Sequence, residues 1–581
     1  MGMDQCFVLF DDMRPGGVGA RIYEQPAEEI AAYSIEDVHP ALEKVRAAVA
    51  GGRHAAGFMA YDAAYALEPK LWSLARHGDG PLLWFGLFDR YRIVDAAEAV
   101  GNGAGGRTSR PRPRITRDQY LSAAANVREH LFAGDFYQAN LTFGCDVAVL
   151  GNPLAAYASL RNRSQAGWAG LVRHSAGWLL SLSPEQFFTV RGRTIEAKPM
   201  KGTAPRRDDP AEDRREVAKL ESDPKQRAEN MMIVDLLRND LARVAEPGTV
   251  EVPDLFRVES FPTVHQMVSR VTAKLRKNVD PVTILETLFP CGSITGAPKL
   301  AAIEALRHLE PEPRGAYTGT MGWIDPGGDA SFNVLIRTLE LQDGHHVARL
   351  GLGSGLVVDS VLEDEWAECL LKGEFVAPDR DEFDLIETMR FDPQAGVVDL
   401  DRHLDRMRSA ADDLDFQFDR HAARNELQAA TFRHKGPAMV RLLLSPKGSM
   451  AIEVKPIPET PHGPVGVAVR PLPVDPSDYR LRYKTTAKDV LKQVRRDAGT
   501  FEAIFTDPEG RLTEGSYTNI FVERDGKLVT PPLERGLLPG LLRQRLIDEG
   551  QAEEGDLRVE DLSEGFLIGN MVRGLMKARL A

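Results

Sequence analysis

The fold of the longer part of this chain is specified most clearly by Ser222-Asp-Pro-Lys-Gln-Arg-Ala-Glu-Asn-Met-Met-Ile-Val-Asp-Leu-Leu-Arg-Asn-Asp240. Its pattern predicts a helix, because Asp223 can cap the free N–H groups of a helix that begins with Pro224. Residues three, four and seven apart share a helix face, so Glu229 is on the same face as Met232, Ile233 and Leu236. A carboxylate on an apolar face needs a cation, although a single acid there is more often a helix-edge residue that turns into water.

A second predicted helix carries further acids. Ser360 can form a capping box with Glu363 at its start. Glu365, Glu368 and Lys372 follow on neighbouring turns. The last two could be only a surface ion pair, but the glutamates of both helices together match the ligands that Mg²⁺ prefers.

Two glycine-rich runs lie between these helices, Cys291-Gly-Ser-Ile-Thr-Gly-Ala-Pro-Lys299 and Gly351-Leu-Gly-Ser-Gly355. Without side chains, such runs let backbone N–H groups approach an anionic ligand, although they also make ordinary tight turns. Neither resembles a nucleotide-binding pattern, because no GK[ST] follows and no GxGxxG opens a helix.

Outward from this part, the chain divides into regions, since 581 residues with 43% apolar composition are too many for one core. We expect an amino-terminal subdomain over residues 1–114, ending in the Gly- and Arg-rich run 101–114, and a catalytic domain over residues 115–376. A charged linker would span 377–382, and residues 383–581 begin a new pattern of strands and helices. The irregular alternation of strands and helices favours an α+β fold over a regular parallel barrel.

Composition excludes several classes of protein. The formal net charge of −13 argues against a protein that binds nucleic acid backbone. No apolar run approaches the roughly 20 residues that span a bilayer, so no membrane association is expected. The four cysteines are far apart and no export segment precedes them, which predicts a cytoplasmic protein.

Six motifs follow one another between residues 118 and 374: Tyr137-Gln-Ala-Asn-Leu-Thr142, Ser183-Pro-Glu-Gln-Phe187, Lys198-Pro-Met-Lys-Gly-Thr203, Met232-Ile-Val-Asp-Leu-Leu-Arg-Asn-Asp240, Tyr317-Thr-Gly-Thr-Met-Gly322 and Phe332-Asn-Val-Leu-Ile-Arg-Thr338. Together they resemble the chorismate-utilising enzymes, the family of anthranilate, aminodeoxychorismate, isochorismate and salicylate synthases. The resemblance implies antiparallel sheets flanked by helices, with chorismate as substrate.

Two positions then distinguish between members of this family. The water-using members place a basic lysine at the position of Gln138, and glutamine cannot deprotonate water. Lys201 stands where anthranilate synthases have alanine, and similar aminodeoxychorismate synthases use that lysine as a nucleophile. The resemblance therefore implies amination of chorismate by ammonia to 4-amino-4-deoxychorismate.

The same resemblance implies roles for individual residues. Lys201 would attack the chorismate ring while Glu185 protonates the departing hydroxyl. For this, Glu185 needs a raised pKa, and Lys201 must be uncharged, which partial burial favours. The implied Mg²⁺ ligands are Glu229, Glu365 and Glu368. The implied substrate contacts are Tyr317, Arg337, Gly353, Lys372 and His265, although a lone strand histidine is more often structural.

A second set of motifs follows: Phe383-Asp-Leu-Ile-Glu-Thr-Met-Arg390, Asp401-Arg-His-Leu-Asp-Arg-Met407, Tyr483-Lys-Thr-Thr486 and Thr513-Glu-Gly-Ser-Tyr-Thr-Asn-Ile-Phe521. It is similar to fold-type IV pyridoxal-phosphate enzymes, the group of branched-chain and D-amino-acid aminotransferases and aminodeoxychorismate lyase. This resemblance implies an α+β domain that binds pyridoxal 5′-phosphate, with Lys484 bonded to the cofactor aldehyde and Glu514 facing the pyridine nitrogen. Arg406, Ser516 and Asn519 would help to bind the cofactor, the first two through its phosphate.

These resemblances together imply a two-step synthesis of 4-aminobenzoate for folate, in which pyruvate is eliminated from the aminated intermediate. The chain has no glutaminase nucleophile in a GxCxGxQ context, so a separate glutamine amidotransferase subunit is the expected source of ammonia. The sequence does not decide whether the chain forms a homodimer through the second domain. Two alternatives remain, an anthranilate-type synthase joined to an aminotransferase and a regulatory chorismate-binding protein with decayed sites; Lys201 disfavours the first, and the intact site residues disfavour the second.

Overall fold

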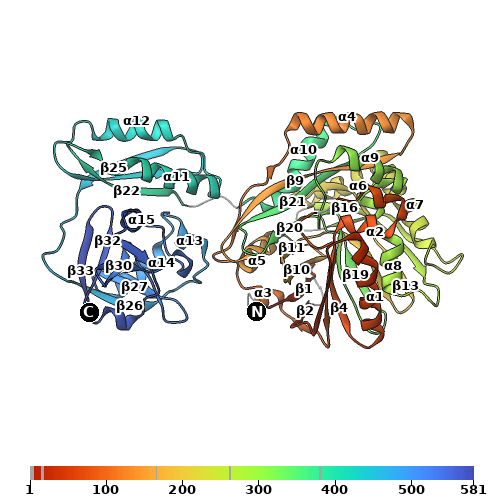
Figure 1. Cartoon of the computed structure of the whole chain (residues 1–581). Helices are drawn as coiled ribbons and strands as arrows, with labels where there is room; N and C mark the ends of the chain where they lie inside the picture. Colours follow the sequence, from red (N-terminus) through yellow and green to blue (C-terminus); the bar gives the residue numbers. More distant parts are fainter. Residues whose placement is uncertain (1–4, 15–18, 77, 165, 261–263, 379–382) are drawn as a thin grey trace. The chain divides into compact units, whose positions relative to one another are not determined.

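A computed structural model describes residues 5–14, 19–76, 78–164, 166–260, 264–378 and 383–581 (Figure 1). The chain forms two compact units. The first comprises residues 1–103, 110–148 and 157–377, and the second comprises residues 104–109, 149–156 and 378–581.

The first unit contains two large antiparallel sheets. One has the strand order β17 (Gly296–Ala297), β9 (Gln138–Leu150), β21 (Val347–Leu356), β20 (Thr338–Gln342), β11 (Gly177–Ser181), β10 (Ala169–His174), β1 (Phe7–Asp11), β2 (Ala20–Glu24) and β6 (Arg92–Val94). The other has the order β14 (Met200–Pro205), β16 (Val264–Lys274), β13 (Thr194–Ala197), β12 (Gln186–Arg191), β19 (Ala330–Asn333), β18 (Thr320–Ile324), β4 (His54–Met59), β5 (Leu83–Phe88) and β3 (Glu28–Ala32), with β15 (Glu251–Ser260) paired to β16. The expected antiparallel α+β architecture is confirmed.

The two sheets share a core in which Val8, Phe58, Trp84, Val172 and Met321 are buried. Helices α1 (Ile35–Ala50), α7 (Pro224–Ala242) and α8 (Pro281–Leu288) pack in a second core against the sheet that contains β4 and β12. Helices α4 (Arg117–Ala133) and α10 (Leu362–Gly373) lie against β21 of the other sheet. The first unit is thus a β-sandwich with helices outside.

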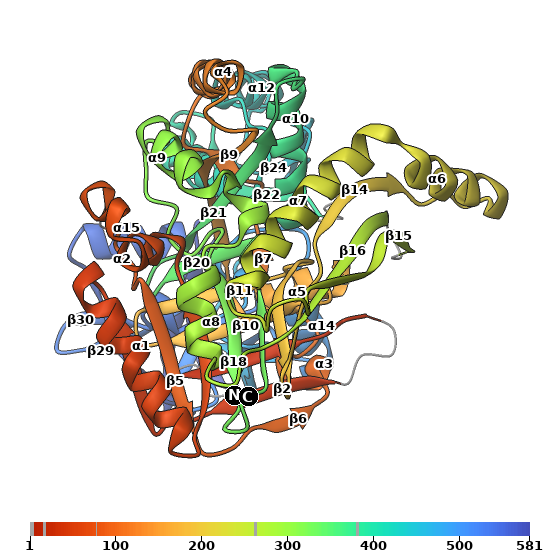
Figure 2. The ribbon, with the colours of Figure 1, turned by 90° about the vertical axis from the view of Figure 1, so that its right-hand side faces the viewer.

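The two helices predicted around the acids both form, one of them with a shifted start. Helix α7 begins at Pro224, where the Asp223 carboxylate accepts two backbone N–H groups at 2.9 and 3.0 Å, as predicted. Figure 2 shows α6 (Pro210–Ser222) leading into α7 beside β14. Helix α10 begins at Leu362, and the predicted capping box is wrong because the Ser360 hydroxyl accepts the N–H of Val357 and donates to Glu365.

The predicted subdomain of residues 1–114 does not form separately. Strands from the first hundred residues belong to both sheets, where β1 and β4 find hydrogen-bonding partners in strands from later in the chain, β10 and β18. Within the run 101–114, residues 104–109 belong to the second unit. The units divide after Ala377, at the start of the predicted linker, whose residues 379–382 lie outside the described ranges.

The second unit has two sheets. A four-stranded sheet has the order β23 (Gly396–Val397), β22 (Leu385–Asp392), β24 (Ala438–Leu444) and β25 (Met450–Pro456), and α11 (Leu400–Leu414) and α12 (Arg420–Thr431) pack against it (Figure 1). An eight-stranded sheet has the order β28 (Leu512–Gly515), β27 (Glu502–Thr506), β26 (Val465–Pro471), β33 (Gly574–Leu580), β32 (Phe566–Asn570), β29 (Asn519–Arg524), β30 (Lys527–Thr530) and β31 (Ala552–Glu554). Of the helices in the described ranges, none has the length and apolarity that crossing a bilayer requires.

A buried ion pair connects separate segments of the first unit. The Arg314 guanidinium donates to both carboxylate oxygens of Glu310, at 2.9 and 2.7 Å. It also donates to the backbone carbonyls of Asn140 and Ile294, at 2.8 and 3.2 Å. Glu310 in turn accepts the backbone N–H and the hydroxyl of Thr142, each at 2.9 Å. One pair of charges therefore holds β9 beside the glycine-rich loop of residues 291–299.

We predict that Arg314→Leu lowers the free energy of unfolding of the first unit by about 3–5 kcal/mol, because it leaves Glu310 buried without a cation. All six tryptophans lie in the first unit, so denaturant unfolding followed by tryptophan fluorescence reports on this unit alone. The control is Arg238→Leu on α7, whose ion pair with Asp235 is exposed. That control should change stability by less than about 1 kcal/mol, and equal effects of the two substitutions would contradict the prediction.

Candidate active sites

Glu185 lies just before β12, in a buried position of the first unit. Its Oε1 accepts a hydrogen bond from the Ser293 hydroxyl at 2.6 Å. Burial raises the pKa of this carboxyl, while the Ser293 hydrogen bond and the charges of Lys201 and Lys372 oppose the rise. A raised pKa is what a carboxyl needs in order to act as a proton donor.

Lys201, on β14, is half-buried and its ammonium lies near Gly355 of β21. A Cβ atom at Gly355 would stand 3.6 Å from Lys201 Nζ and 2.6 Å from Gln138 Nε2. A larger residue would therefore crowd the amide of Gln138. The structure brings together the predicted nucleophile, the predicted acid and the glutamine that distinguished the ammonia-using members.

Lys372, on α10, contacts Gly353, which is also a predicted substrate-binding residue. Its ammonium donates to the backbone carbonyl of Gly353 at 3.0 Å and pairs with Glu368 Oε1 at 2.7 Å. Ser293 was not predicted as a site residue, although it lies in the glycine-rich loop that the sequence singled out. Its contact with Glu185 joins residues more than a hundred positions apart, which no local pattern could indicate.

The predicted metal ligands are not gathered into one site. Glu365 Oε1 accepts the Ser360 hydroxyl at 2.7 Å, and Glu368 is paired with Lys372. Within the described ranges, no three His, Cys, Asp or Glu side chains are close enough to share an ion. In the arrangement found, Glu365 and Glu368 have other partners, so the binding of Mg²⁺ by Glu229, Glu365 and Glu368 stays a prediction.

Tyr317 and Arg337 are placed by backbone geometry. The Tyr317 ring packs so tightly on Gly351 that a Cβ there would lie 2.0 Å from it. Arg337 has a positive φ of 51° just before β20. The residue is exposed, and desolvation lowers the pKa of its guanidinium.

His265 differs from its predicted substrate-binding role. The ring is buried on β16, with Nε2 at 2.8 Å from Asp213 Oδ1 and Nδ1 at 2.8 Å from the Ser260 hydroxyl. Both ring nitrogens therefore have protein partners, because the residue points at α6 and β15. In this arrangement His265 connects β16 to α6 and β15 through its two ring nitrogens.

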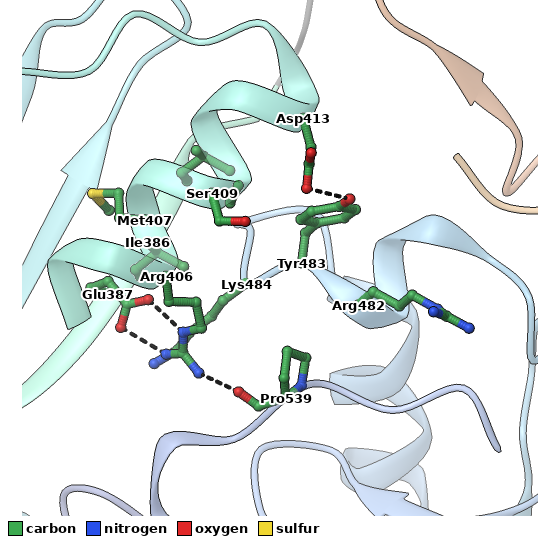
Figure 3. A pocket seen from close by; sticks show the side chains of 12 residues that line it. Ile386, Glu387, Arg406, Met407, Ser409, Asp413, Arg482, Tyr483, Lys484 and Pro539 are labelled. Atoms are coloured by element: carbon green, nitrogen blue, oxygen red, sulfur yellow. Dashed lines mark hydrogen bonds and ion pairs between the residues drawn. The ribbon is translucent and has the colours of Figure 1, made fainter. Parts of the chain in front are cut away.

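The second unit contains a cavity of about 210 Å³ (Figure 3). It is lined by β22, by α11 and by the segment Arg482-Tyr483-Lys484, with Pro539 opposite. Burial lowers the pKa of the Lys484 amine to about 8, although the charge of Glu387 opposes this; Arg406 and Lys488 add to the lowering. An amine with such a pKa has an appreciable uncharged fraction at neutral pH and can react with a carbonyl.

Arg406 is oriented by a residue that the sequence did not single out. Its Nε and Nη2 donate to the two carboxylate oxygens of Glu387 at 2.8 and 2.7 Å, and its Nη1 donates to the carbonyl of Pro539 at 3.0 Å (Figure 3). Burial alone would raise the pKa of Glu387, but Arg406, a hydrogen bond with His403 and the charge of Lys484 hold it well below its ordinary range. Glu387 therefore remains an anion that fixes Arg406 beside the cavity.

Glu514, on β28, is buried, which raises its pKa to about 7, while the ammonium of Lys488 opposes the rise. The Asn519 amide donates to the carbonyl of Leu538 at 3.4 Å. The Ser516 hydroxyl donates to Glu502 at 2.6 Å, so the predicted phosphate contact of Ser516 would require this bond to be exchanged.

These residues fit pyridoxal phosphate, since the cavity has a reactive amine in Lys484 and a fixed cation in Arg406, with the carboxylate of Glu514 in the same unit. The amine can bond to the aldehyde, the guanidinium can bind phosphate, and the carboxylate can pair with the pyridine nitrogen.

Comparison with known proteins agrees with this division. Residues 5–378 match the model of the chorismate binding enzymes, and residues 384–580 match that of the class IV amino-transferases. Aminodeoxychorismate synthase component 1 of Klebsiella aerogenes is 42% identical over 261 residues, which cover 45% of this chain and 57% of that protein. Anthranilate synthase component 1 of Streptomyces coelicolor is 36% identical over 313 residues, which cover 54% of this chain and 59% of that protein.

The chain thus spans less than two thirds of the length of these relatives. Anthranilate synthase component I from Streptococcus pneumoniae has the same fold, with a TM-score of 0.51 at 22% identity over 64% of this chain and 89% of that one. With the fold, the two sites and the family matches in agreement, the chain belongs to the chorismate binding enzymes and carries a class IV amino-transferase domain in the same polypeptide.

Proposed function

We propose that this protein makes 4-aminobenzoate from chorismate in two steps. The first unit would replace the 4-hydroxyl of chorismate by ammonia, and the second would eliminate pyruvate from the product. The observation that carries the proposal is the presence of Lys201 in one site with the buried acid Glu185 and with Gln138.

The first step is a displacement across the ring diene, carried out twice. The Lys201 amine bonds to ring carbon 2, both ring double bonds shift, and the 4-hydroxyl departs as water with the proton of Glu185. Ammonia then bonds to carbon 4, both double bonds shift back, the bond to Lys201 breaks, and the proton that the bound ammonia loses returns to Glu185. Chorismate and ammonia thereby give 4-amino-4-deoxychorismate and water.

The raised pKa of Glu185 supports this role, because an ionised carboxylate could not supply the proton. Gln138 can hydrogen-bond to substrate or ammonia but cannot activate water. We also propose that ammonia comes from a separate glutamine amidotransferase subunit, since the similar Klebsiella protein is named component 1 of its synthase. Ammonium ion would replace that subunit in a test.

The second step uses the cavity around Lys484. Bound pyridoxal phosphate would supply an electron sink for the charge left when a ring proton departs. Arg406, fixed by Glu387, would hold the phosphate, and Glu514 would pair with the pyridine nitrogen. The Lys484 amine, with a pKa near 8, can take up and return a proton at neutral pH. Pyruvate leaves as the ring becomes aromatic, so no amino acceptor is needed.

The competing function is an anthranilate-type synthase joined to an aminotransferase, which the likeness to the Streptomyces coelicolor protein keeps open. The two functions differ in the position of the amino group on the aromatic product. Lys201 favours the para product, because the anthranilate synthases of the family have no amine there.

We predict that Lys201→Ala lowers formation of 4-amino-4-deoxychorismate from chorismate and ammonium by about 100-fold or more, the scale expected for loss of a reacting group. Chromatographic identification of the product measures this directly. The matched control is Lys277→Ala, an exposed lysine in a turn before α8, which should retain the parent rate. Unchanged synthesis by Lys201→Ala would rule out the covalent route, and anthranilate from the parent protein would favour the competing function.

A second prediction concerns the reactivity of Lys484 without any cofactor. Competitive acetylation across pH, followed by mass spectrometry, should give this amine a midpoint of about 8. Ordinary exposed lysines should titrate near ~10.4. Because the charge of Glu387 favours the ammonium form, Glu387→Gln should move the midpoint to lower pH. A midpoint for Lys484 equal to that of exposed lysines would show that its amine is not activated.

The third prediction separates a lyase from an aminotransferase. Full-length protein loaded with pyridoxal phosphate should convert 4-amino-4-deoxychorismate into equal amounts of 4-aminobenzoate and pyruvate without added 2-oxo acid. Lys484→Ala should lose both this activity and the visible absorbance of lysine-bound cofactor, whereas Lys527→Ala, at an exposed lysine at the start of β30, should retain both. A requirement for a 2-oxo acid, with an amino acid as product, would instead identify an aminotransferase.

A further inference from the structure

A second buried lysine follows Lys484 by four residues in the second unit. Lys488 immediately precedes α14 (Asp489–Ala498), and its ammonium donates to the carbonyl of Leu481 at 3.0 Å. The same ammonium lies 3.8 Å from Glu514 Oε1, with 12% of the lysine side chain and 6% of the glutamate side chain exposed. Neither proposed step gives this lysine a role.

The charges around Lys488 come from several elements. Besides Glu514 on β28, it faces Asp478, which precedes α13 (Tyr479–Arg482), and the cation of Arg406 on α11. Its own charge acts on Lys484, where it opposes protonation of the amine. Lys488 thus interacts with both the predicted attachment point of the cofactor and the predicted partner of its pyridine nitrogen.

Glu514 has its own set of neighbours. It accepts the backbone N–H of Leu538 and feels the charges of Glu502 on β27 and Arg543 on α15 (Leu541–Asp548). The carboxylate of Glu502 is engaged by the hydroxyls of the 516–518 segment. Arg543 donates to the carbonyl of Pro531 and is paired with Glu554. Lys488 is therefore placed as the counter-ion of Glu514.

We propose that Lys488 is a positioning residue of the second site, which acts through Glu514 to set how firmly the pyridine nitrogen of bound pyridoxal phosphate keeps its proton. This inference rests on the proposed function of the second unit. Before a cofactor binds, the ammonium neutralises Glu514. With pyridoxal phosphate bound, the carboxylate would be shared between the ammonium and the pyridine nitrogen.

The direction of the effect follows from the signs of the charges. Glu514 would stabilise a proton on the pyridine nitrogen, and a cation beside that carboxylate would oppose it. Lys488 also opposes protonation of the Lys484 amine, and it would oppose protonation of the same nitrogen when it is bonded to the cofactor. Loss of the ammonium should therefore make both nitrogens hold their protons to higher pH.

The test compares Lys488→Met, Lys488→Arg and Lys492→Met in the full-length protein loaded with pyridoxal phosphate. Lys492 lies one turn further along α14 and is 42% exposed, so its replacement is the same chemical change away from the site. The visible absorbance of the bound cofactor, titrated with pH, should shift its midpoint upward by about one unit in Lys488→Met. Lys488→Arg and Lys492→Met should titrate like the parent. With cofactor labelled at the pyridine nitrogen, the pH midpoint of the ¹⁵N chemical shift should also move upward in Lys488→Met.

A second readout needs no cofactor. In cofactor-free protein, Lys488→Met leaves Glu514 buried without its counter-ion, so peptides of residues 502–515 should exchange amide hydrogen faster. Adding Glu514→Gln in the same chain should restore slow exchange, because the neutral amide needs no cation. Failure of this rescue would mean that Lys488 and Glu514 are not coupled.

The outcomes separate the two levels of the proposal. An unchanged midpoint in Lys488→Met, or equal shifts in Lys488→Met and Lys488→Arg, would overturn the role of Lys488 while leaving the second unit a pyridoxal-phosphate enzyme. Absence of a cofactor band in the parent protein would overturn both this inference and the proposed function of that unit.

Discussion

Arg314 distributes its donors between the carboxylate of Glu310 and the backbone carbonyls of two segments that are far apart in sequence. One of those carbonyls belongs to Ile294, the neighbour of the serine that holds Glu185. The other belongs to Asn140, two residues after Gln138 on β9. The acid and the glutamine of the first site therefore take their relative positions from one desolvated guanidinium, and a buried arginine provides rigid, multi-pronged donors for this purpose.

Burial acts on the two sites in opposite ways because their neighbours differ. Glu185 is buried and accepts the Ser293 hydroxyl, and burial raises the pKa of its carboxyl although the charges of Lys201 and Lys372 oppose the rise. Glu387 is equally enclosed, but Arg406 and His403 compensate its charge and keep it an anion. Lys484 is buried near one anion and several cations, so its amine is held between its charged and neutral forms. The same desolvation thus yields an acid, a fixed anion and a nucleophile, according to which charges lie beside each group.

Local patterns in the sequence predicted what depends on neighbouring residues. The start of α7 follows from a capping aspartate before a proline, and the strands of the first hundred residues follow from short β-rich runs. The motifs, through their family resemblance, also implied roles for Glu185, Lys201, Arg406 and Lys484, and these roles stay predictions. The partners of these residues could not be predicted, because Ser293 meets Glu185 from a distant segment and Glu387 meets Arg406 only through the packing of α11 on β22. The same limit explains the differences found: Ser360 turns to Glu365, His265 meets Asp213 from α6, and the three glutamates are not gathered into one cluster.

The second unit includes residues 104–109 and 149–156, which lie hundreds of positions before the rest of it. There β7 (Arg107–Thr108) pairs with the end of β9, the carbonyl of Gly105 accepts the N–H of Tyr479, and Arg107 donates to the carbonyl of Leu414. A gene cut at residue 383 would deprive the downstream product of these pieces and leave Tyr479 and Leu414 without their acceptor and donor. During synthesis on the ribosome, residues 104–109 could not make their contacts with Leu414 and Tyr479 until those later residues had emerged. Separating the two catalysts in evolution would therefore require remodelled surfaces on the downstream half as well as a new stop and start codon.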